Sequence, residues 1–360
     1  MRMLFGVFDW GLGHATRDTP IIEALLKENE VDILSTGRSL KLLKDHFKKR
    51  CRYFNVPSVY APYSHSKFFV AKFIISIPRM YFTFKKARKI SEKIIKKNNY
   101  NIVISDCRYD VYDKKENSFL INHQLKLKSP IFQWGVDKYM AFRMGNYNLV
   151  IVPDFKNRML SDELSINKSF KGKINFIGPL SRLKKRNVKE DIDFFISLSG
   201  SEPSRTVFEK IILSQVSDLN GKIVITRGMP EWKNKWSKQR ITFYNFLDLE
   251  KQEEIMNRAK FIISRSGYST LMDLIELKKN KVLFVPTPGQ TEQEHLADFY
   301  EKRNMFHHIH QNKLNLIKDI NDSLKFKGYK TNWTTEDSVR KFMQAVFHEK
   351  SFHRSYKSHK

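Results

Sequence analysis

The amino-acid sequence predicts an α/β protein made of two domains of similar size, each built on a parallel sheet. Three observations lead to this expectation. The chain has 360 residues, which suits two hydrophobic cores of about 150 to 200 residues each better than one. Short apolar runs alternate with segments of helical periodicity, which is typical of β-α-β units. The alternation stops once, after residue 177, and then starts again.

Five apolar runs of strand length predict the sheet of the first domain. They are residues 3–8, 31–35, 102–105, 118–121 and 149–152. Residues 17–28 and 40–47 lie between the early strands and have apolar side chains at helical spacing. We assign residues 1–177 to this domain.

The second domain follows a segment rich in Gly, Pro and basic residues, 178–190, which we interpret as a linker. Strands are expected at 194–198, 222–226, 241–244, 261–263 and 282–285, and helices at 207–213 and 271–277. We assign residues 191–325 to this domain. Residues 326–360 are expected to add a closing helix at 339–347 and a basic tail that frays.

The chain is strongly basic, with a formal net charge of +27. Nucleic acid, an anionic membrane surface or a phosphorylated substrate would suit this charge, and so would a general use of Lys at solvated positions. The two cysteines, Cys51 and Cys107, have no metal-type spacing. No apolar run reaches the ~20 residues of a membrane span, and the N-terminal run is expected to be a strand and not a signal peptide. We therefore expect a cytoplasmic protein, either soluble or peripheral on the inner membrane face.

Residues 67–100 differ from the rest of the chain because aromatic and aliphatic side chains there precede a basic segment. The stretch has ten Lys and Arg against one acid, Glu92, and Pro78 is expected to interrupt it. This composition favours contact with an anionic membrane surface. An amphipathic helix packed on its own domain, with a solvated Lys face, explains it as well.

A glycine-rich turn ending in a histidine follows the first predicted strand. Gly11 and Gly13 allow a tight turn, and His14 then stands at the mouth of the crevice. Histidine titrates near neutral pH and can take a proton from a hydroxyl group. Asp18 occupies the place where a dinucleotide-binding motif needs a small residue, so NAD binding is not favoured. The alternative is a structural or helix-capping histidine.

Two turns of the second domain have the composition of an anion site. Small, hydroxyl and cationic residues follow its first strand (Ser199, Gly200, Ser201, Arg205) and its fourth strand (Ser266, Gly267, Ser269, Thr270). Free N–H groups and hydroxyls at the start of a helix suit a diphosphate. Asp273, one turn into that helix, could accept hydrogen bonds from ribose hydroxyls. The alternative is an ordinary helix cap.

Amide and carboxylate side chains follow the last predicted strand of this domain. Gln290, Gln293 and Glu294 can each bind sugar hydroxyls by bidentate hydrogen bonds. Taken alone, they would equally suit a solvated helix start.

On these motifs the chain resembles the family 28 glycosyltransferases, the group that includes the peptidoglycan enzyme adding N-acetylglucosamine to lipid I. The segments SRSGYSTLMDLIEL, LFVPTPGQTEQEHLA and NFLD resemble the family's donor domain, and GLGHATR its first loop. The resemblance spans roughly residues 1–310. It is greatest to an uncharacterised branch of predicted glycosyltransferases with the motifs SDxRYxxY and HQL, here at residues 105–112 and 123–125.

The resemblance implies a GT-B fold, in which two Rossmann-like domains face a cleft, and an inverting, metal-independent transfer with no cofactor besides the nucleotide sugar. It also implies roles for single residues. Phe246 and Leu247 fall where the family holds uracil, and Ser266, Gly267 and Arg182 fall at or near its diphosphate positions. Asp273 corresponds to the family's ribose-binding glutamate, and Gln293 and Glu294 correspond to its sugar-contacting Gln-Gln pair. His14 corresponds to the histidine of the N-terminal loop.

We therefore expect a glycosyltransferase that uses a nucleotide sugar, most simply a UDP-sugar, in cell-envelope or polysaccharide biosynthesis. His14 is expected to be the base, assisted by Asp106. The acceptor is unknown, and residues 67–100 favour a lipid-linked one. The alternatives are a sugar-nucleotide epimerase on the same fold, a basic nucleic-acid-binding protein, and a sugar-binding scaffold without catalysis. No nucleic-acid-binding module is recognisable, and no specific nucleic acid is expected.

Overall fold

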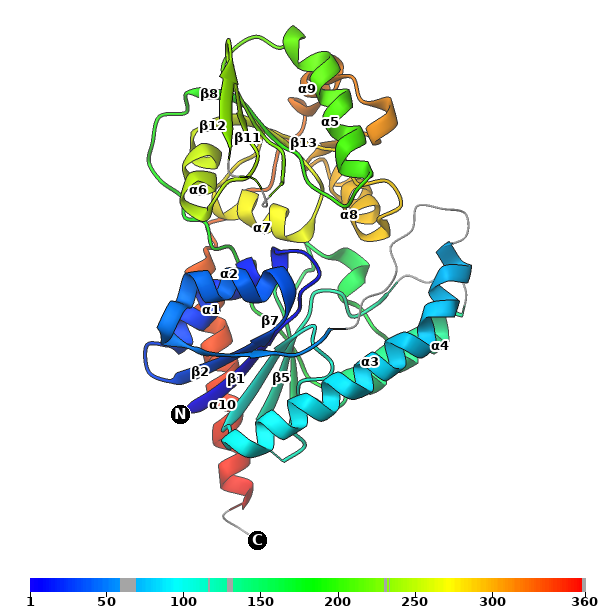
Figure 1. Cartoon of the computed structure of the whole chain (residues 1–360), viewed down its shortest axis with the longest axis vertical. Coiled ribbons are helices and arrows are strands. Elements are labelled where there is room, and N and C mark those ends of the chain that lie inside the picture. The colour runs from blue at the N-terminus through cyan, green and yellow to red at the C-terminus, as the bar shows by residue number, and fades with distance from the viewer. Residues whose placement is uncertain (59–68, 116, 128–131, 230–231, 233, 358–360) are drawn as a thin grey trace. The chain divides into compact units, whose positions relative to one another are not determined.

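The computed structural model describes residues 1–58, 69–115, 117–127, 132–229, 232 and 234–357 (Figure 1). The chain divides into two compact units: unit 1 comprises Met1–Arg182 and Trp333–Lys360, and unit 2 comprises Leu183–Asn332. The chain passes from unit 1 to unit 2 inside the segment interpreted as a linker. Helix α10 (Thr335–Lys357) belongs to unit 1, where it packs against α1 (Gly13–Leu25). It begins before the expected closing helix, 339–347, and extends through most of the basic tail.

Unit 1 contains a seven-stranded sheet in the order β3-β2-β1-β4-β5-β6-β7. Its strands are β1 (Arg2–Val7), β2 (Glu30–Ser35), β3 (Arg52–Asn55), β4 (Ile102–Asp106), β5 (Asn117–Ile121), β6 (Leu149–Val152) and β7 (Ile174–Phe176). All neighbouring strands pair in parallel. The two edge strands, β3 and β7, were not predicted because they are short and half-exposed, so they lack a continuous apolar run.

The helices of unit 1 begin and end differently from the sequence expectation. They are α1, α2 (Gly37–Phe47), α3 (Phe69–Asn98), α4 (Gln133–Met144) and α10, with short 3-10 turns η1 (Lys48–Arg50) and η2 (Asp162–Ser165). α1 starts four residues before the expected 17, which places His14 in its first turn. α3 continues through Pro78. The expected interruption is wrong because a proline removes one backbone donor, and the turns on either side still form their own hydrogen bonds.

Helix α3 has two different halves. Its C-terminal half packs on the sheet through Ala87 and Ile95, which join a core cluster with Leu4 and Val103. Its N-terminal half exposes apolar side chains, including Ile75 and Phe82. Packing of residues 67–100 on their own domain is therefore seen for the C-terminal half of α3. Residues 67–68 lie outside the described residues. No helix in the described part of the chain is long and apolar enough to span a membrane.

Unit 2 contains a second seven-stranded sheet in the order β10-β11-β9-β8-β12-β13-β14. Its strands are β8 (Ile192–Ser197), β9 (Ile223–Thr226), β10 (Lys235–Lys238), β11 (Ile241–Tyr244), β12 (Ala259–Ser264), β13 (Val282–Phe284) and β14 (His307–His308). Only the pair β10–β11 is antiparallel. β10 and β14 were not predicted because the first is exposed and polar and the second has two residues.

The helices of unit 2 lie on both faces of this sheet (Figure 1). They are α5 (Ser204–Gln215), α6 (Leu249–Arg258), α7 (Tyr268–Glu276), α8 (Thr291–Lys302) and α9 (Leu316–Ser323), with 3-10 turns η3 (Val216–Asp218) and η4 (Gln311–Lys313). The core on one face joins Phe208 of α5 and Ile320 of α9 to Ile196, Ile225 and Ile263 of the strands. Each Å² of apolar surface buried between the layers stabilises the folded state by about 25 cal/mol.

Each sheet reverses its winding direction beside its first strand. In unit 1, β1 lies between β2 and β4, and in unit 2, β8 lies between β9 and β12. Open parallel sheets bind ligands beyond the carboxyl ends of the strands at this switch point. The two switch points therefore define where each unit is expected to hold a ligand.

Candidate active site

The turn after β1 places His14 at the switch point of unit 1. Gly11 has φ +70°, a left-handed conformation that favours glycine, and a Cβ there would contact no atom within 4 Å. The requirement at this position is therefore conformational. Because α1 begins at Gly13, His14 lies in the first helical turn, where its side chain is half-buried.

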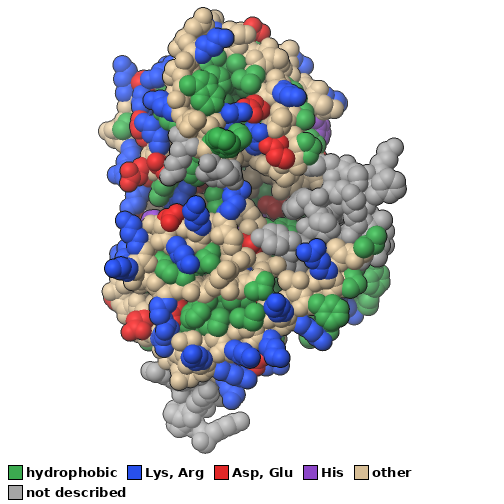
Figure 2. All heavy atoms as spheres, viewed as in Figure 1, with side chains coloured by type: hydrophobic (Ala, Val, Ile, Leu, Met, Phe, Trp, Pro, Cys, Tyr) green, Lys and Arg blue, Asp and Glu red, His purple; other side chains and the backbone are tan. Residues whose placement is uncertain are grey.

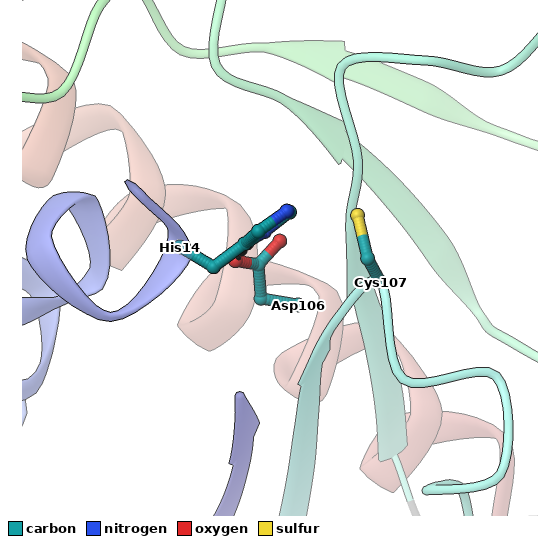
Figure 3. Close-up of side chains that lie close together, drawn as sticks. All are labelled: His14, Asp106 and Cys107. Carbon is teal, nitrogen blue, oxygen red and sulfur yellow. Dashed lines mark hydrogen bonds and ion pairs between the residues drawn. The ribbon is translucent and has the colours of Figure 1, made fainter. Parts of the chain in front are cut away.

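Asp106 reaches the same point from the end of β4. It pairs in register with Val7 at the end of β1 and is fully buried. Its Oδ2 lies 2.7 Å from Nδ1 of His14 (Figure 3). The structure thus brings together the two residues that the sequence singled out for acid–base work.

Arg17 completes this pair and was missed by the sequence analysis. Its guanidinium donates to Oδ1 of Asp106 and lies 3.0 Å from Nδ1 of His123, and its side chain is 3 % exposed. Burial by itself would raise the pKa of Asp106, but Arg17 and His14 outweigh it and hold this pKa far below its usual range. Asp106 is therefore a carboxylate at neutral pH. The Arg17 guanidinium also lies 3.0 Å from His14 Nδ1, but the shorter contact of this nitrogen is with Asp106, and a carboxylate can only accept. A proton on Nδ1 satisfies that contact and leaves the Nε2 lone pair free.

Asp18 is a second buried carboxyl group in this cluster, with no exposed surface. Burial and the charge of Asp106 raise its pKa well above the usual range. The available signal was the helix period, because positions three and four residues after His14 share its face of α1. Arg17 and Asp18 occupy those positions.

His14, Asp106 and Cys107 lie close enough together to be tested as metal ligands (Figure 3). Two observations oppose a metal there. Arg17 already supplies a positive charge to Asp106 and lies 3.9 Å from the Cys107 sulfur. Burial and the charge of Asp106 also raise the pKa of the Cys107 thiol well above its usual value, whereas a metal needs a thiolate. These residues do not fit a metal ion.

In unit 2, three turns converge at the carboxyl ends of β8, β12 and β13. Gly200, after β8, has φ +114°, and a Cβ there would lie 3.3 Å from Thr287 Oγ1 and 3.7 Å from Arg265 Nε. Arg265 was not singled out from the sequence, yet it joins all three turns. It donates to the backbone oxygens of Ser199, Ser204, Val285 and Pro286 and to the side chain of Gln311.

Arg265 also supplies charge at this switch point. Its acceptors are all neutral oxygens, and no carboxylate of the described residues forms an ion pair with it. Burial lowers its pKa to about 10, so it is still a cation at neutral pH. A buried cation without a paired carboxylate favours an anion at the adjacent Ser266-Gly267 turn.

The remaining residues proposed for the second domain have varied surroundings. Ser266 is buried and donates to the backbone oxygen of Gln293, 2.8 Å away. Gln293 Oε1 and Glu294 Oε1 accept from the N–H groups of Thr287 and Gly289, both at 2.9 Å, so these oxygens brace the turn after β13. The others are exposed (Ser199, Ser201), half-buried (Phe246, Gly267, Ser269, Thr270, Asp273, Gln290) or buried (Leu247).

Two arginines lie in settings that the sequence did not indicate. Arg205 is buried and forms ion pairs with Glu202 and Glu209, so its charge is balanced within unit 2. It is therefore less suited than Arg265 to neutralise a diphosphate. Arg182 is the last residue of the first segment of unit 1, while the other residues assigned to the donor belong to unit 2.

Comparison with known proteins agrees with both halves of this description. Residues 1–117 match the model of "Glycosyl transferase family 1", and residues 198–346 match that of the "Glycosyltransferase family 28 C-terminal domain". No curated protein matches the chain.

Solved structures share the fold over nearly the whole chain. A calicheamicin glycosyltransferase has a TM-score of 0.61 at 10% identity, covering 95% of this chain and 93% of its own. MurG of Acinetobacter baumannii has a TM-score of 0.54 at 12% identity, covering 96% and 97%. A spinosyn rhamnosyltransferase complexed with thymidine diphosphate has a TM-score of 0.60 at 10% identity, covering 90% of each chain.

The two Rossmann-like units define a protein of the GT-B fold, and the two family models define its class. The chain is a glycosyltransferase in which residues 1–117 match the family 1 model and residues 198–346 match the C-terminal domain of family 28.

Proposed function

We propose that this glycosyltransferase transfers a sugar from a nucleotide sugar to a hydroxyl acceptor, with inversion and without a metal ion, and that His14 is the general base. The observation that carries this proposal is the 2.7 Å contact between His14 Nδ1 and the Asp106 carboxylate. This contact fixes the tautomer and leaves Nε2 to accept a proton. Asp106 then stabilises the imidazolium that forms.

The proposed reaction is a single displacement at the anomeric carbon. The acceptor oxygen forms a bond to this carbon as its proton passes to His14 Nε2, and the bond to the diphosphate oxygen breaks. Attack opposite the leaving group inverts the anomeric configuration. The turn Ser266-Gly267, the first turn of α7 and the nearby Arg265 cation support the departing diphosphate electrostatically.

We propose a pyrimidine nucleoside diphosphate, UDP first, as the donor's nucleotide. The family resemblance of the NFLD turn supports uracil, and Asp273 in the second turn of α7 suits the ribose. One structurally similar rhamnosyltransferase is a complex with thymidine diphosphate, which is also a pyrimidine. UDP and thymidine diphosphate are therefore the two nucleotides to compare.

A lipid-linked acceptor at an anionic membrane is the corresponding proposal for unit 1. The N-terminal half of α3 exposes Ile75, Tyr81 and Phe82, and α4 exposes Trp134 and Phe142. The helices contact each other, since the Arg143 guanidinium of α4 lies 3.9 Å from the centre of the Phe84 ring of α3. Figure 2 shows Lys and Arg side chains interspersed with hydrophobic ones on the face that it displays. Such a mixed surface suits an anionic bilayer.

Replacement of His14 tests the base. His14→Ala is expected to lower kcat by about 10²- to 10⁴-fold, the usual contribution of a general base, and to leave the affinity for UDP unchanged. His46→Ala is the matched control, because His46 also contacts a carboxylate, that of Glu23, but far from the switch point. Near-full activity of His14→Ala would exclude His14 as the base.

Ligand-induced stabilisation tests the donor and separates the rival functions. A ligand at about 100 times its Kd stabilises the folded protein by about 2.7 kcal/mol, which thermal unfolding detects. We expect stabilisation by UDP and its loss in Asp273→Ala. Stabilisation by oligonucleotides alone would favour a nucleic-acid-binding protein. In an analysis of the products formed without an acceptor, a sugar whose ring configuration has changed would favour an epimerase.

A further inference from the structure

A chain of alternating carboxylates and imidazoles lies where the edge strand β14 meets α8 and α9. His307 and His308 form β14 and share Glu301 of α8, whose two oxygens lie 2.5 Å and 3.0 Å from their Nδ1 atoms. Beyond them, Asp319 of α9 faces His307 Nε2, and Asp298 of α8 faces His308 Nε2. The proposed transfer reaction uses none of these residues.

The surroundings of His307 orient its lone pair. Its Nδ1 hydrogen bonds to the Glu301 carboxylate, so Nδ1 carries a proton. The Phe326 ring stacks on the imidazole with centroids 5.4 Å apart and fixes its plane. Nε2 is buried and has no hydrogen-bond partner among the described residues.

Two carboxylates face this nitrogen from α9. Nε2 of His307 and one oxygen each of Asp319 and Asp322 all lie within 4.8 Å of one another, and the Asp319 Oδ1 distance is 3.9 Å. The other oxygen of Asp319 accepts from the N–H of Asn315, 2.7 Å away, which holds Oδ1 toward His307. Asp322 also bonds to Lys325, whose side chain is 74% exposed and can move away.

His307 thus directs a buried ring nitrogen at two carboxylates, an arrangement that a bound cation would stabilise. We propose that His307, Asp319 and Asp322 bind a divalent transition-metal ion, with Zn²⁺ the best match to one imidazole and two carboxylates. Glu301 has the role of the carboxylate that orients a metal-bound histidine through its other nitrogen. A proton on Nε2 is the competing occupant.

The position of the site indicates a structural ion. α8 begins after the turn that follows β13, on the side of the sheet where the donor is proposed to bind, and Glu301 lies at the opposite end of this helix. The ion would add a link between α9 and the edge strand β14, which pairs with β13 over two residues and contacts α8 through Glu301. We therefore expect the ion to stabilise unit 2 without changing its affinity for UDP.

Titration of the chelator-treated full-length protein with Zn²⁺, and with Co²⁺ for its visible absorption, tests the site. We expect one tight equivalent, a higher Tm with Zn²⁺, and binding at least tenfold weaker in both His307→Gln and Asp322→Asn. His46→Gln is the control for adventitious binding by a surface histidine and should bind like the unaltered protein. UDP affinity should be the same with and without the metal.

Two outcomes would overturn the proposal. One is Zn²⁺ binding that is absent or equally strong in all four proteins. The other is an Nε2-protonated His307 at pH 8, seen by ¹⁵N NMR, that persists when Zn²⁺ is added, since a proton would then balance the two carboxylates. Neither outcome bears on the role of His14, because the transferase reaction is proposed for other residues.

Discussion

The Asp106 carboxylate lies 2.7 Å from His14 Nδ1, although 92 positions separate the two residues in the sequence. The sheet causes this contact, because β1 and β4 are neighbours and the pairing of Val7 with Asp106 aligns their carboxyl ends. Arg17 and Asp18 then approach from the same face of α1. The result is a buried cluster in which the pKa of Asp106 is lowered and that of Asp18 is raised.

Replacing each of the two aspartates by asparagine should have different effects on kcat. Asp106→Asn removes the charge that stabilises the imidazolium of His14, so we expect kcat to fall by about 10²- to 10⁴-fold. The raised pKa of Asp18 favours its neutral form, which an amide of the same shape imitates, so Asp18→Asn is expected to leave kcat nearly unchanged. Steady-state kinetics with the nucleotide-sugar donor measures both. Equal losses would contradict the assignment of charges.

Asp18 also predicts a pH dependence of stability. Its folded-state pKa is raised, so above the unfolded-state pKa of about 4 the folded protein holds a proton that the unfolded chain releases. The contribution of Asp18 to stability therefore decreases as pH rises above about 4. Asp18→Asn removes this dependence. We expect its Tm to exceed that of the unaltered protein at pH 8 and the difference to shrink toward pH 5. A difference that is constant with pH would contradict a raised pKa of Asp18.

Arg265→Lys keeps the positive charge, but we expect it to weaken donor binding. Lysine cannot reproduce the guanidinium's simultaneous bonds to Ser199, Val285 and Gln311, so the three turns lose their common anchor. We expect the Kd for UDP, measured by calorimetry, to rise by about tenfold or more, corresponding to about 1.4 kcal/mol. Lys210→Arg, an exposed position on α5, is the control. An unchanged Kd in Arg265→Lys would show that charge alone suffices.

The exposed aromatic residues of α3 and α4 predict binding to anionic vesicles. The double substitution Phe82→Ser and Phe142→Ser removes apolar side chains that are 68% and 71% exposed, so the fold should be unaffected. We expect sedimentation with phosphatidylglycerol vesicles to decrease at least fivefold and binding to phosphatidylcholine to be weak throughout. Leu213→Ser, which alters an exposed apolar residue of α5, should bind as before. Vesicle binding that survives the double substitution would place the contact elsewhere.

The regular parts of the fold were predictable because their sequence signals are local. Buried parallel strands such as β4 and β6 are continuous apolar runs, and α7 has a clear helical period. β10 and β14 were not predictable, because edge strands are exposed or very short and owe their conformation to the neighbouring strand. The continuation of α3 through Pro78 likewise depends on packing of its later turns on the sheet.

The sequence by itself determined the fold class, the division into two α/β halves and the two glycine-containing turns at which ligands are expected to bind. Those features follow from periodicity and from residues with special backbone freedom, which act over a few positions. Only the tertiary structure decided which side chains meet there. The pairing of β1 with β4 brought Asp106 to His14, and the buried neighbours of the two aspartates shifted the pKa of Asp18 up and that of Asp106 down. Arg265 became the common anchor of three turns in the same way, because contacts between distant segments and the loss of water around a charge do not exist until the sheet has formed.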